Sequence, residues 1–195
     1  MRTFILGLIL GLVAVPLIVY AYFVTGTAPV ATSAKPMPFE KTLANGALHA
    51  RIDKEMPKNV PIPANEDNYK AGAQVYREHC AVCHGTPGQD QSAIAKGMFP
   101  KPPQLFKGKG VTDDEPGETY WKVANGIRMT GMPAFGKSLS DTQMWQVTLL
   151  LAYADKIPDS VKQSLTPEPA ATNSVAQPTE KTPGTSKKAA IHQPQ

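Results

Sequence analysis

The chain has 195 residues, of which 42% are hydrophobic and 18% charged, and a formal net charge of +4. That length allows one domain or a domain with appendages. The basic excess lies outside residues 65–157, where ten Lys/Arg and ten Asp/Glu cancel. Nucleic-acid binding, which requires a basic surface, therefore has little support in the probable folded part.

The first 25 residues predict a transmembrane anchor. Phe4–Val24 is almost continuously apolar over 21 residues, and no charged residue occurs from Thr3 to Ala34. At helical rise this run reaches about 30 Å, the thickness of a bilayer core. Arg2 precedes it and favours a cytoplasmic N-terminus, so the rest of the chain would cross the membrane. A cleaved signal peptide is the alternative, although its apolar core is usually shorter.

Residues 26–64 are interpreted as a linker that contains a possible short helix. Apolar residues recur at close to helical spacing over Phe39–Glu55, with Asn45-Gly46 as a weak point. This helix is expected to pack on the folded domain or to shorten the linker. Pro57, Pro61 and Pro63 then form a stiff, extended segment.

Residues 65–157 predict an all-α domain, because they contain helical patterns and loops rich in Gly and Pro. Capping and stop signals give three helices: Tyr69–Cys80 after a cap at Asp67 or Asn68, Glu118–Asn125 closed by Gly126, and a helix from Ser140 or Asp141 to about Lys156. Residues 158–195 are nearly free of large apolar side chains and are predicted to be a disordered tail.

The strongest motif is Cys80-Ala81-Val82-Cys83-His84, the attachment signature for a c-type haem. Two thiols at this spacing add to the two vinyl groups of one porphyrin, and the following histidine binds its iron. The motif uses both cysteines of the chain. A structural zinc site would need a second ligand pair. A thioredoxin-like pair needs flanking strands, and a disulfide would leave His84 without a role.

The second iron ligand is expected to be a methionine, whose thioether stabilises ferrous iron and raises the reduction potential. Four methionines lie within the predicted domain: Met98, Met129, Met132 and Met144. Met144 falls on the last helix and suits core packing, and Met98 is close to His84 in sequence. Met129 and Met132 share one loop, and both are soft ligands of a suitable type.

Here the chain resembles the class I cytochromes c, in particular the single-haem modules related to haem subunits of cbb3-type oxidases. The resemblance covers residues 65–157 and rests on three features: Cys80-Ala-Val-Cys-His-Gly85, Asn125-Gly126 with Gly131-Met132-Pro133-Ala-Phe-Gly136, and Trp145. It implies a cytochrome c fold of three to five helices around one covalently bound haem. It also implies that Met132 is the axial ligand opposite His84, with Met129 second.

The same resemblance implies two supporting contacts. The carbonyl of Pro103 would accept a hydrogen bond from the free ring nitrogen of His84, which orients the imidazole. The first helix would cross the last one through Gly72 and Tyr76, against an apolar–aromatic pair that corresponds to Leu150 and Tyr153. His79 is expected to point away from the porphyrin, and His49 is a remote alternative as a ligand.

The predicted function is one-electron transfer by a membrane-anchored, monohaem cytochrome c, with the haem bound through Cys80, Cys83, His84 and Met132. The protein is expected to be no enzyme, to bind no nucleic acid or small-molecule substrate, and to have redox donor and acceptor proteins as partners. A single-pass position in the inner membrane, with the haem domain in the periplasm, follows from the anchor. The alternatives are a haem c subunit of a larger oxidase or dehydrogenase complex, and an open-site haem enzyme or gas sensor.

Overall fold

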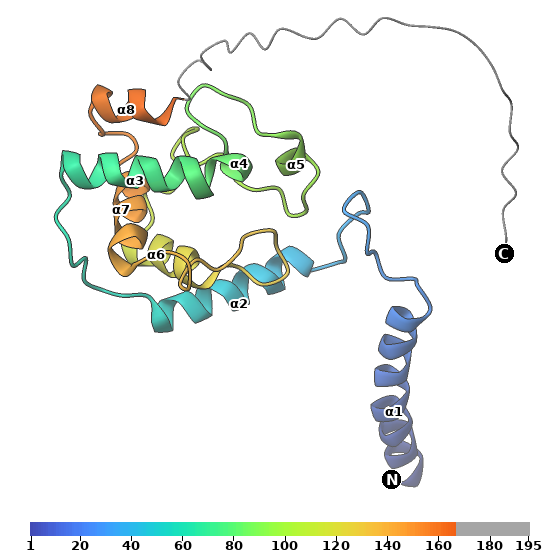
Figure 1. The fold of residues 1–195 in the computed structure, drawn as a ribbon. Helices are drawn as coiled ribbons and strands as arrows, with labels where there is room; N and C mark the ends of the chain where they lie inside the picture. The colour runs from blue at the N-terminus through green and yellow to red at the C-terminus, as the bar shows by residue number, and fades with distance from the viewer. Residues whose placement is uncertain (167–195) are drawn as a thin grey trace, which may run out of the picture.

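The computed structural model describes residues 1–166, and these residues fold into helices and loops without a β-strand (Figure 1). The all-α class predicted from the sequence is confirmed. The helices are α1 (Arg2–Val24), α2 (Glu40–Glu55), α3 (Glu66–His79), α4 (Ala81–His84), α5 (Ala93–Lys96), α6 (Pro116–Asn125), α7 (Asp141–Ala152) and α8 (Asp159–Leu165).

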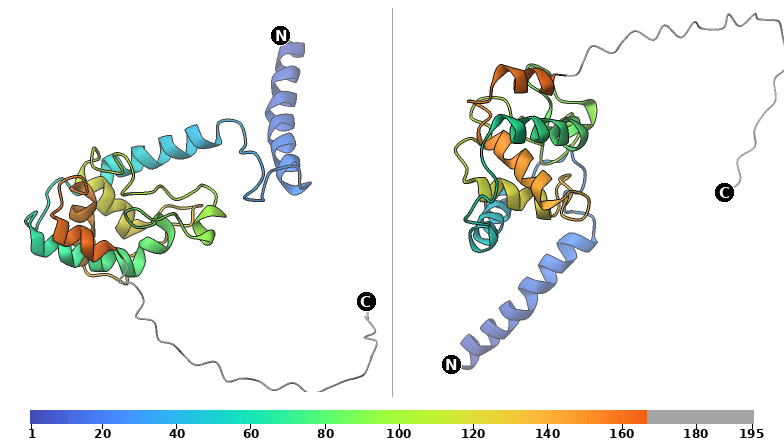
Figure 2. Two further views of the ribbon diagram at one scale, coloured as in Figure 1. Left: turned by 90° about the horizontal axis from the view of Figure 1, so that it is seen from above. Right: turned by 60° about the vertical axis from the view of Figure 1, so that its left-hand side comes forward.

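Helix α1 stands apart from the other helices in all three views (Figures 1 and 2). None of its residues is buried, and its mean hydropathy is 2.7 over the most apolar window. It continues through Pro16. Its length and composition suit a membrane-spanning helix, and they equally suit a signal sequence.

Helix α2 packs against α6, so the second half of the predicted linker belongs to the folded unit. Asn45-Gly46 does not interrupt it. Ile52 is 1% exposed, and the indole Nε1 of Trp121 donates to the Glu55 carboxylate at 3.1 Å. A Cβ on Gly117 would lie 2.0 Å from the carbonyl oxygen of Pro57, so the chain after α2 touches the start of α6 backbone to backbone.

Replacing Ile52 by alanine is expected to destabilise the docking of α2 by about 2–5 kcal/mol, because it is the buried residue of this helix. Hydrogen exchange of the α2 amides should then accelerate far more than that of the α7 amides. The exposed neighbour Leu43 supplies the control, since Leu43→Ala should change neither. Equal acceleration in both helices would show that α2 does not open separately.

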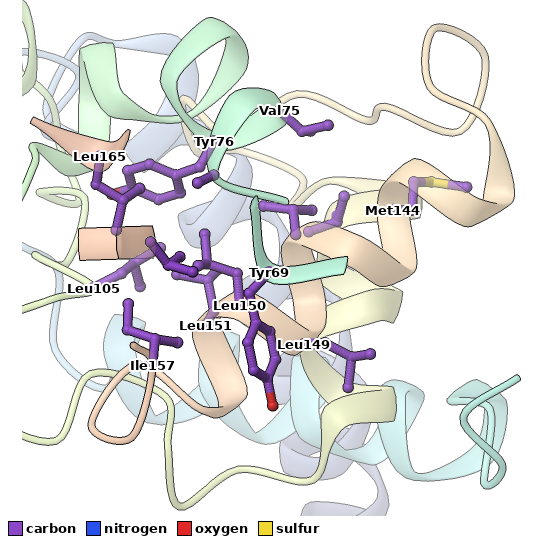
Figure 3. Close-up of a cluster of buried hydrophobic side chains, with 14 of the residues drawn as sticks. Tyr69, Val75, Tyr76, Leu105, Met144, Leu149, Leu150, Leu151, Ile157 and Leu165 are labelled. Atoms are coloured by element: carbon purple, nitrogen blue, oxygen red, sulfur yellow. The ribbon is translucent and has the colours of Figure 1, made fainter. Parts of the chain in front are cut away.

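The core lies where α3 crosses α7, and Figure 3 shows the side chains that fill it. Gly72 faces α7 so closely that a Cβ there would lie 2.3 Å from the Gln146 carbonyl oxygen and 3.1 Å from the Cβ of Leu150. Tyr76 and Leu150 are fully buried. The predicted crossing is therefore confirmed at Gly72, Tyr76 and Leu150, whereas Tyr153 pairs its ring with Tyr69 at 5.9 Å.

Three predicted helix ends differ from the structure, and one of them is the start of α6, which lies at Pro116 rather than Glu118. The cap of α3 is Asn65, whose side chain accepts from the Asn68 amide at 3.0 Å, rather than Asp67 or Asn68. Helix α7 begins after the capping box of Ser140, as predicted, but it ends at Ala152 and turns before Pro158.

The prediction of a disordered tail from residue 158 is wrong for its first part. Helix α8 packs on α3, with Val161 and Leu165 fully buried and the Ser160 hydroxyl donating to Glu66 at 2.7 Å. Burial of each apolar side chain stabilises by about 1.5–3 kcal/mol, so two of them hold this short helix despite its polar composition. Residues 167–195 of the predicted tail lie outside the described part of the chain.

Candidate functional site

A largely apolar cavity opens between the segment around α4 and the loop after α6. Cys80, Cys83 and His84 line it from one side, and Met132 lines it from the loop. Most of the remaining lining is apolar or proline. The structure thus brings together all four residues that the sequence predicts as haem-binding.

The two thiols are held at the junction of α3 and α4. Cys80 follows the last residue of α3 and donates its backbone N–H to the Tyr76 carbonyl at 2.8 Å, while Cys83 lies within α4. Both thiols are free and half-buried. Burial, with a smaller contribution from Cys83, raises the pKa of Cys80 to about 12, so this sulfur carries its proton at neutral pH.

His84 is oriented by the loop that follows α5. Its Nδ1 lies 2.8 Å from the Pro103 carbonyl oxygen, as the family resemblance implies. A carbonyl only accepts, so Nδ1 carries the hydrogen and Nε2 keeps its lone pair. Burial lowers the pKa of His84, and the bond to Pro103 opposes that shift. A neutral imidazole with a free Nε2 is the form that binds a metal ion.

The turn after His84 is fixed by Tyr76, whose hydroxyl donates to the Gly85 carbonyl at 2.6 Å. Gly85 has a φ of 75°, a left-handed conformation that glycine adopts without a steric penalty. Phe106 packs edge-on against the Tyr76 ring at 5.0 Å. The core therefore sets the position at which the chain leaves His84.

The methionine loop turns Met132 inward and Met129 outward. The backbone of Met132 is held within the loop. Its amide donates to the Thr130 hydroxyl at 3.1 Å, and its carbonyl accepts from the Ile127 amide at 3.2 Å. Met132 is half-buried, whereas Met129 is 92% exposed with a φ of 59°. Met144 is buried on α7, in the core. The geometry favours Met132 over Met129 as the sulfur ligand.

Two further side chains of the cavity wall, each of a type that can bind iron, were not assigned to the site from the sequence. Met98 is a second thioether in the cavity, although it lies only fourteen residues after His84. His79 is exposed, as expected, but it also lines the cavity and packs edge-on against Phe135 at 5.8 Å, so it does not point away from the cavity. Spacing alone gives no signal for either, because the loop conformations bring them in. His49 lies on α2, and its Nε2 is 3.9 Å from a carboxylate oxygen of Glu118.

The donor set fits a covalently attached haem. An apolar cavity is lined by two thiols, one imidazole and one thioether, which are the groups expected for thioether bonds and for nitrogen and sulfur ligation. Within residues 1–166, no group of three or more His, Cys, Asp or Glu is placed to hold a metal ion. A structural zinc site needs four such ligands, and no set of that kind is assembled in that part of the chain.

The same segment is similar to known proteins. Residues 67–151 match the family described as cytochrome c oxidase, cbb3-type, subunit III. A thiosulfate dehydrogenase of Stutzerimonas stutzeri strain A1501 is 36% identical over 89 residues, which are 45% of this chain and 28% of that protein. A chain from the reducing HAO-like protein complex of Kuenenia stuttgartiensis aligns with a TM-score of 0.44 and 25% identity, over 63% of this chain and 52% of that one.

Proposed function

We propose that the protein is a membrane-anchored, one-electron carrier with a single haem, because residues 67–151 match the family of cbb3-type cytochrome c oxidase subunit III, whose domain is a c-type cytochrome. The observation that carries the proposal is the meeting of Cys80, Cys83, His84 and Met132 in one apolar cavity. A haem held there supplies one-electron exchange between ferric and ferrous iron.

Each residue has a distinct role in this proposal. Cys80 and Cys83 would hold the group through thioether bonds, and His84, whose ring is fixed by Pro103, would supply nitrogen ligation. Met132 supplies a soft thioether, which favours the reduced state. With His84 and Met132 both bound to iron, a haem in this cavity would have no open position for a substrate, so we infer an electron carrier rather than an enzyme.

Four exposed apolar side chains in the segments that line the cavity suit contact with redox partner proteins. In residues 65–166 the exposed large hydrophobic side chains are Val82, Ile94, Phe99 and Met129, at 53%, 67%, 42% and 92%. Val82, Phe99 and Met129 are each adjacent in sequence to a residue of the cavity wall. Ile94 is connected to Val82, because the hydroxyl of Ser92, two residues before Ile94, donates to the Val82 carbonyl at 2.6 Å. Exposed apolar groups gathered at one site mark an interaction surface.

The charge distribution indicates the kind of partner. Residues 79–108 and 126–140, which form the cavity, carry five Lys/Arg and one Asp/Glu, whereas the remainder of residues 65–157 carries five and nine. A domain that is neutral as a whole is therefore positive where the cavity lies. Such a field would steer a partner with an acidic contact surface.

Reversing the charge of Lys101 and Arg128 together is expected to slow oxidation of the reduced protein by ferricyanide about tenfold at low salt. Oxidation by a cationic cobalt complex should accelerate, and both effects should shrink at 1 M salt because the Debye length falls to about 3 Å. Stopped-flow absorbance measures both rates. Lys70→Glu on α3 is the matched control and should change neither; equal effects from Lys70→Glu would contradict a localised field.

We further propose that α1 anchors the protein in the inner membrane, with the haem domain in the periplasm. Its length of 23 residues suits a membrane span, and Arg2 at its N-terminal end favours this orientation. The second candidate function is that of a haem c subunit in a larger oxidase or dehydrogenase complex. It is favoured by the relative named thiosulfate dehydrogenase, of which the matching segment is 28%. Co-purification of a catalytic subunit in mild detergent would distinguish this candidate from a free carrier.

The function is tested by expressing the full chain in a host that matures c-type cytochromes and measuring its intact mass and redox titration. The expected result is a mass increase of one haem that survives acid extraction, together with a one-electron wave. Cys83→Ser should weaken covalent attachment, and the double variant with Cys80→Ser should abolish it. Attachment of haem in the double variant would contradict the proposal.

A further inference from the structure

Met98 is the feature of the cavity that the proposed function leaves unused. It is half-buried, lines the cavity with Met132, and has no counterpart among the roles assigned above. We propose that Met98 is a positioning residue whose methyl group holds the Met132 loop (residues 127–132) closed over the cavity. This inference rests on the proposed function, because it takes Met132 to be the sulfur ligand.

The contact is with the backbone immediately before Met132. A Cβ on Gly131 would lie 1.6 Å from the Met98 Cε and 3.4 Å from its sulfur. The Met98 methyl group therefore occupies the volume that a side chain at position 131 would need. Glycine at 131 lets the tip of Met98 lie directly against the main chain of the Met132 loop.

Met98 reaches this loop from the side of the cavity that holds His84. The segment of residues 98–103 starts with the Met98 amide donating to Ala95 at 3.3 Å and ends with the Pro103 carbonyl at His84. Between them, the Gln91 amide nitrogen donates to the Pro102 carbonyl at 2.6 Å and to the Cys83 carbonyl at 3.2 Å. One segment thus contacts both walls that carry the proposed iron ligands.

The Met132 loop has little else to hold it across the cavity. Its hydrogen bonds are internal: Ile127 with Met132, and Thr130 with Ile127 and Met132. In the described structure no hydrogen bond joins residues 127–132 to residues 79–103. Side-chain packing therefore carries the closure, and Met98 provides the contact at the residue next to the ligand.

Imidazole binding to the ferric, full-length protein measures this closure. An external ligand binds iron only when Met132 has left, so its apparent affinity reports the fraction of protein with the loop open. Met98→Ala removes the packing and should tighten imidazole binding about tenfold, equivalent to about 1.4 kcal/mol. The weak near-red sulfur–iron absorption band should persist at neutral pH. When the pH is raised, the band should disappear at a lower pH than in the native protein.

A reciprocal pair makes the test specific to the contact. Gly131→Ala alone forces the Met98 tip to move and should also tighten imidazole binding. In the Met98→Ala background, the same substitution puts a methyl group within 1.6 Å of the vacated position, so the double variant should return toward native affinity. Met98→Leu keeps apolar volume without sulfur and should stay within about threefold of the native protein.

Leu165→Ala controls for a general loss of stability, because it removes a fully buried side chain on α8, outside the cavity wall. It should lower the unfolding temperature and leave imidazole affinity unchanged. Unchanged affinity in Met98→Ala, or additive effects in the double variant, would overturn the positioning role alone. Loss of the near-red band in Met98→Leu, with its retention in Met132→Ala, would instead make Met98 the ligand and overturn the assignment of Met132.

Discussion

Met132→Ala is expected to lower the reduction potential by on the order of 0.2 V, a part of the ~0.8 V range over which axial ligands tune haem proteins. The thioether favours ferrous iron, and its removal withdraws that preference. The near-red sulfur–iron band should vanish, and the reduced protein should bind carbon monoxide rapidly. Redox titration and difference spectra measure the three changes on one sample.

Met129→Ala is the matched control, because the two methionines lie in the same loop and differ in direction. Met129 is 92% exposed, so its removal should leave the potential, the near-red band and carbon monoxide binding as they are. The reverse result, in which Met129→Ala loses the band and Met132→Ala keeps it, would show that the loop reorganises when haem is attached.

Gly72→Ala is expected to cost several kcal/mol of stability, at or above the upper end of the roughly 1–3 kcal/mol typical of overpacking. The added Cβ would meet the Gln146 carbonyl oxygen at 2.3 Å. That atom belongs to the backbone of α7, so a rotamer change cannot relieve the clash and the two helices must separate. Thermal or denaturant unfolding of the haem-loaded protein measures the loss.

Gly46→Ala supplies the comparison, since it makes the same change in a helix where nothing lies within 4 Å of the new Cβ. Alanine favours a helix interior over glycine by about 0.5–1 kcal/mol, so this variant should be as stable as the native protein or more so. A similar loss in both variants would mean that α3 and α7 do not cross as closely as described.

The sequence predicted the chemistry of the site better than its boundaries. The cysteine motif and His84 could be named because they form a short pattern with a chemical meaning. The choice of Met132 over Met129 and the Pro103 contact followed from the family resemblance. Met98 and His79 were missed as cavity residues because loop conformation, rather than spacing, brings them there. The conformation of such a loop is stabilised by the surfaces on which its side chains pack, and those surfaces cannot be predicted from the loop sequence alone.

Helix α8 illustrates the same limit in the fold. Its sequence, Asp159-Ser-Val-Lys-Gln-Ser-Leu165, has two apolar residues four apart, which is too weak a pattern to distinguish from a polar tail. Both become fully buried because α3 offers a complementary surface. The cap of α3 was missed for a similar reason, because Asn65, Asp67 and Asn68 all have side chains of a type that can cap a helix. In the structure it is Asn65 that accepts the hydrogen bond from the Asn68 amide.

The central claim is a closed haem site in which His84 and Met132 occupy both axial positions. Exposure of the reduced, full-length native protein to carbon monoxide tests it most directly, with the visible spectrum recorded over seconds to minutes. We predict an unchanged spectrum, because no ligand position is open. Rapid and stoichiometric carbon monoxide binding by the native protein would contradict the claim and favour an open-site haem enzyme or gas sensor.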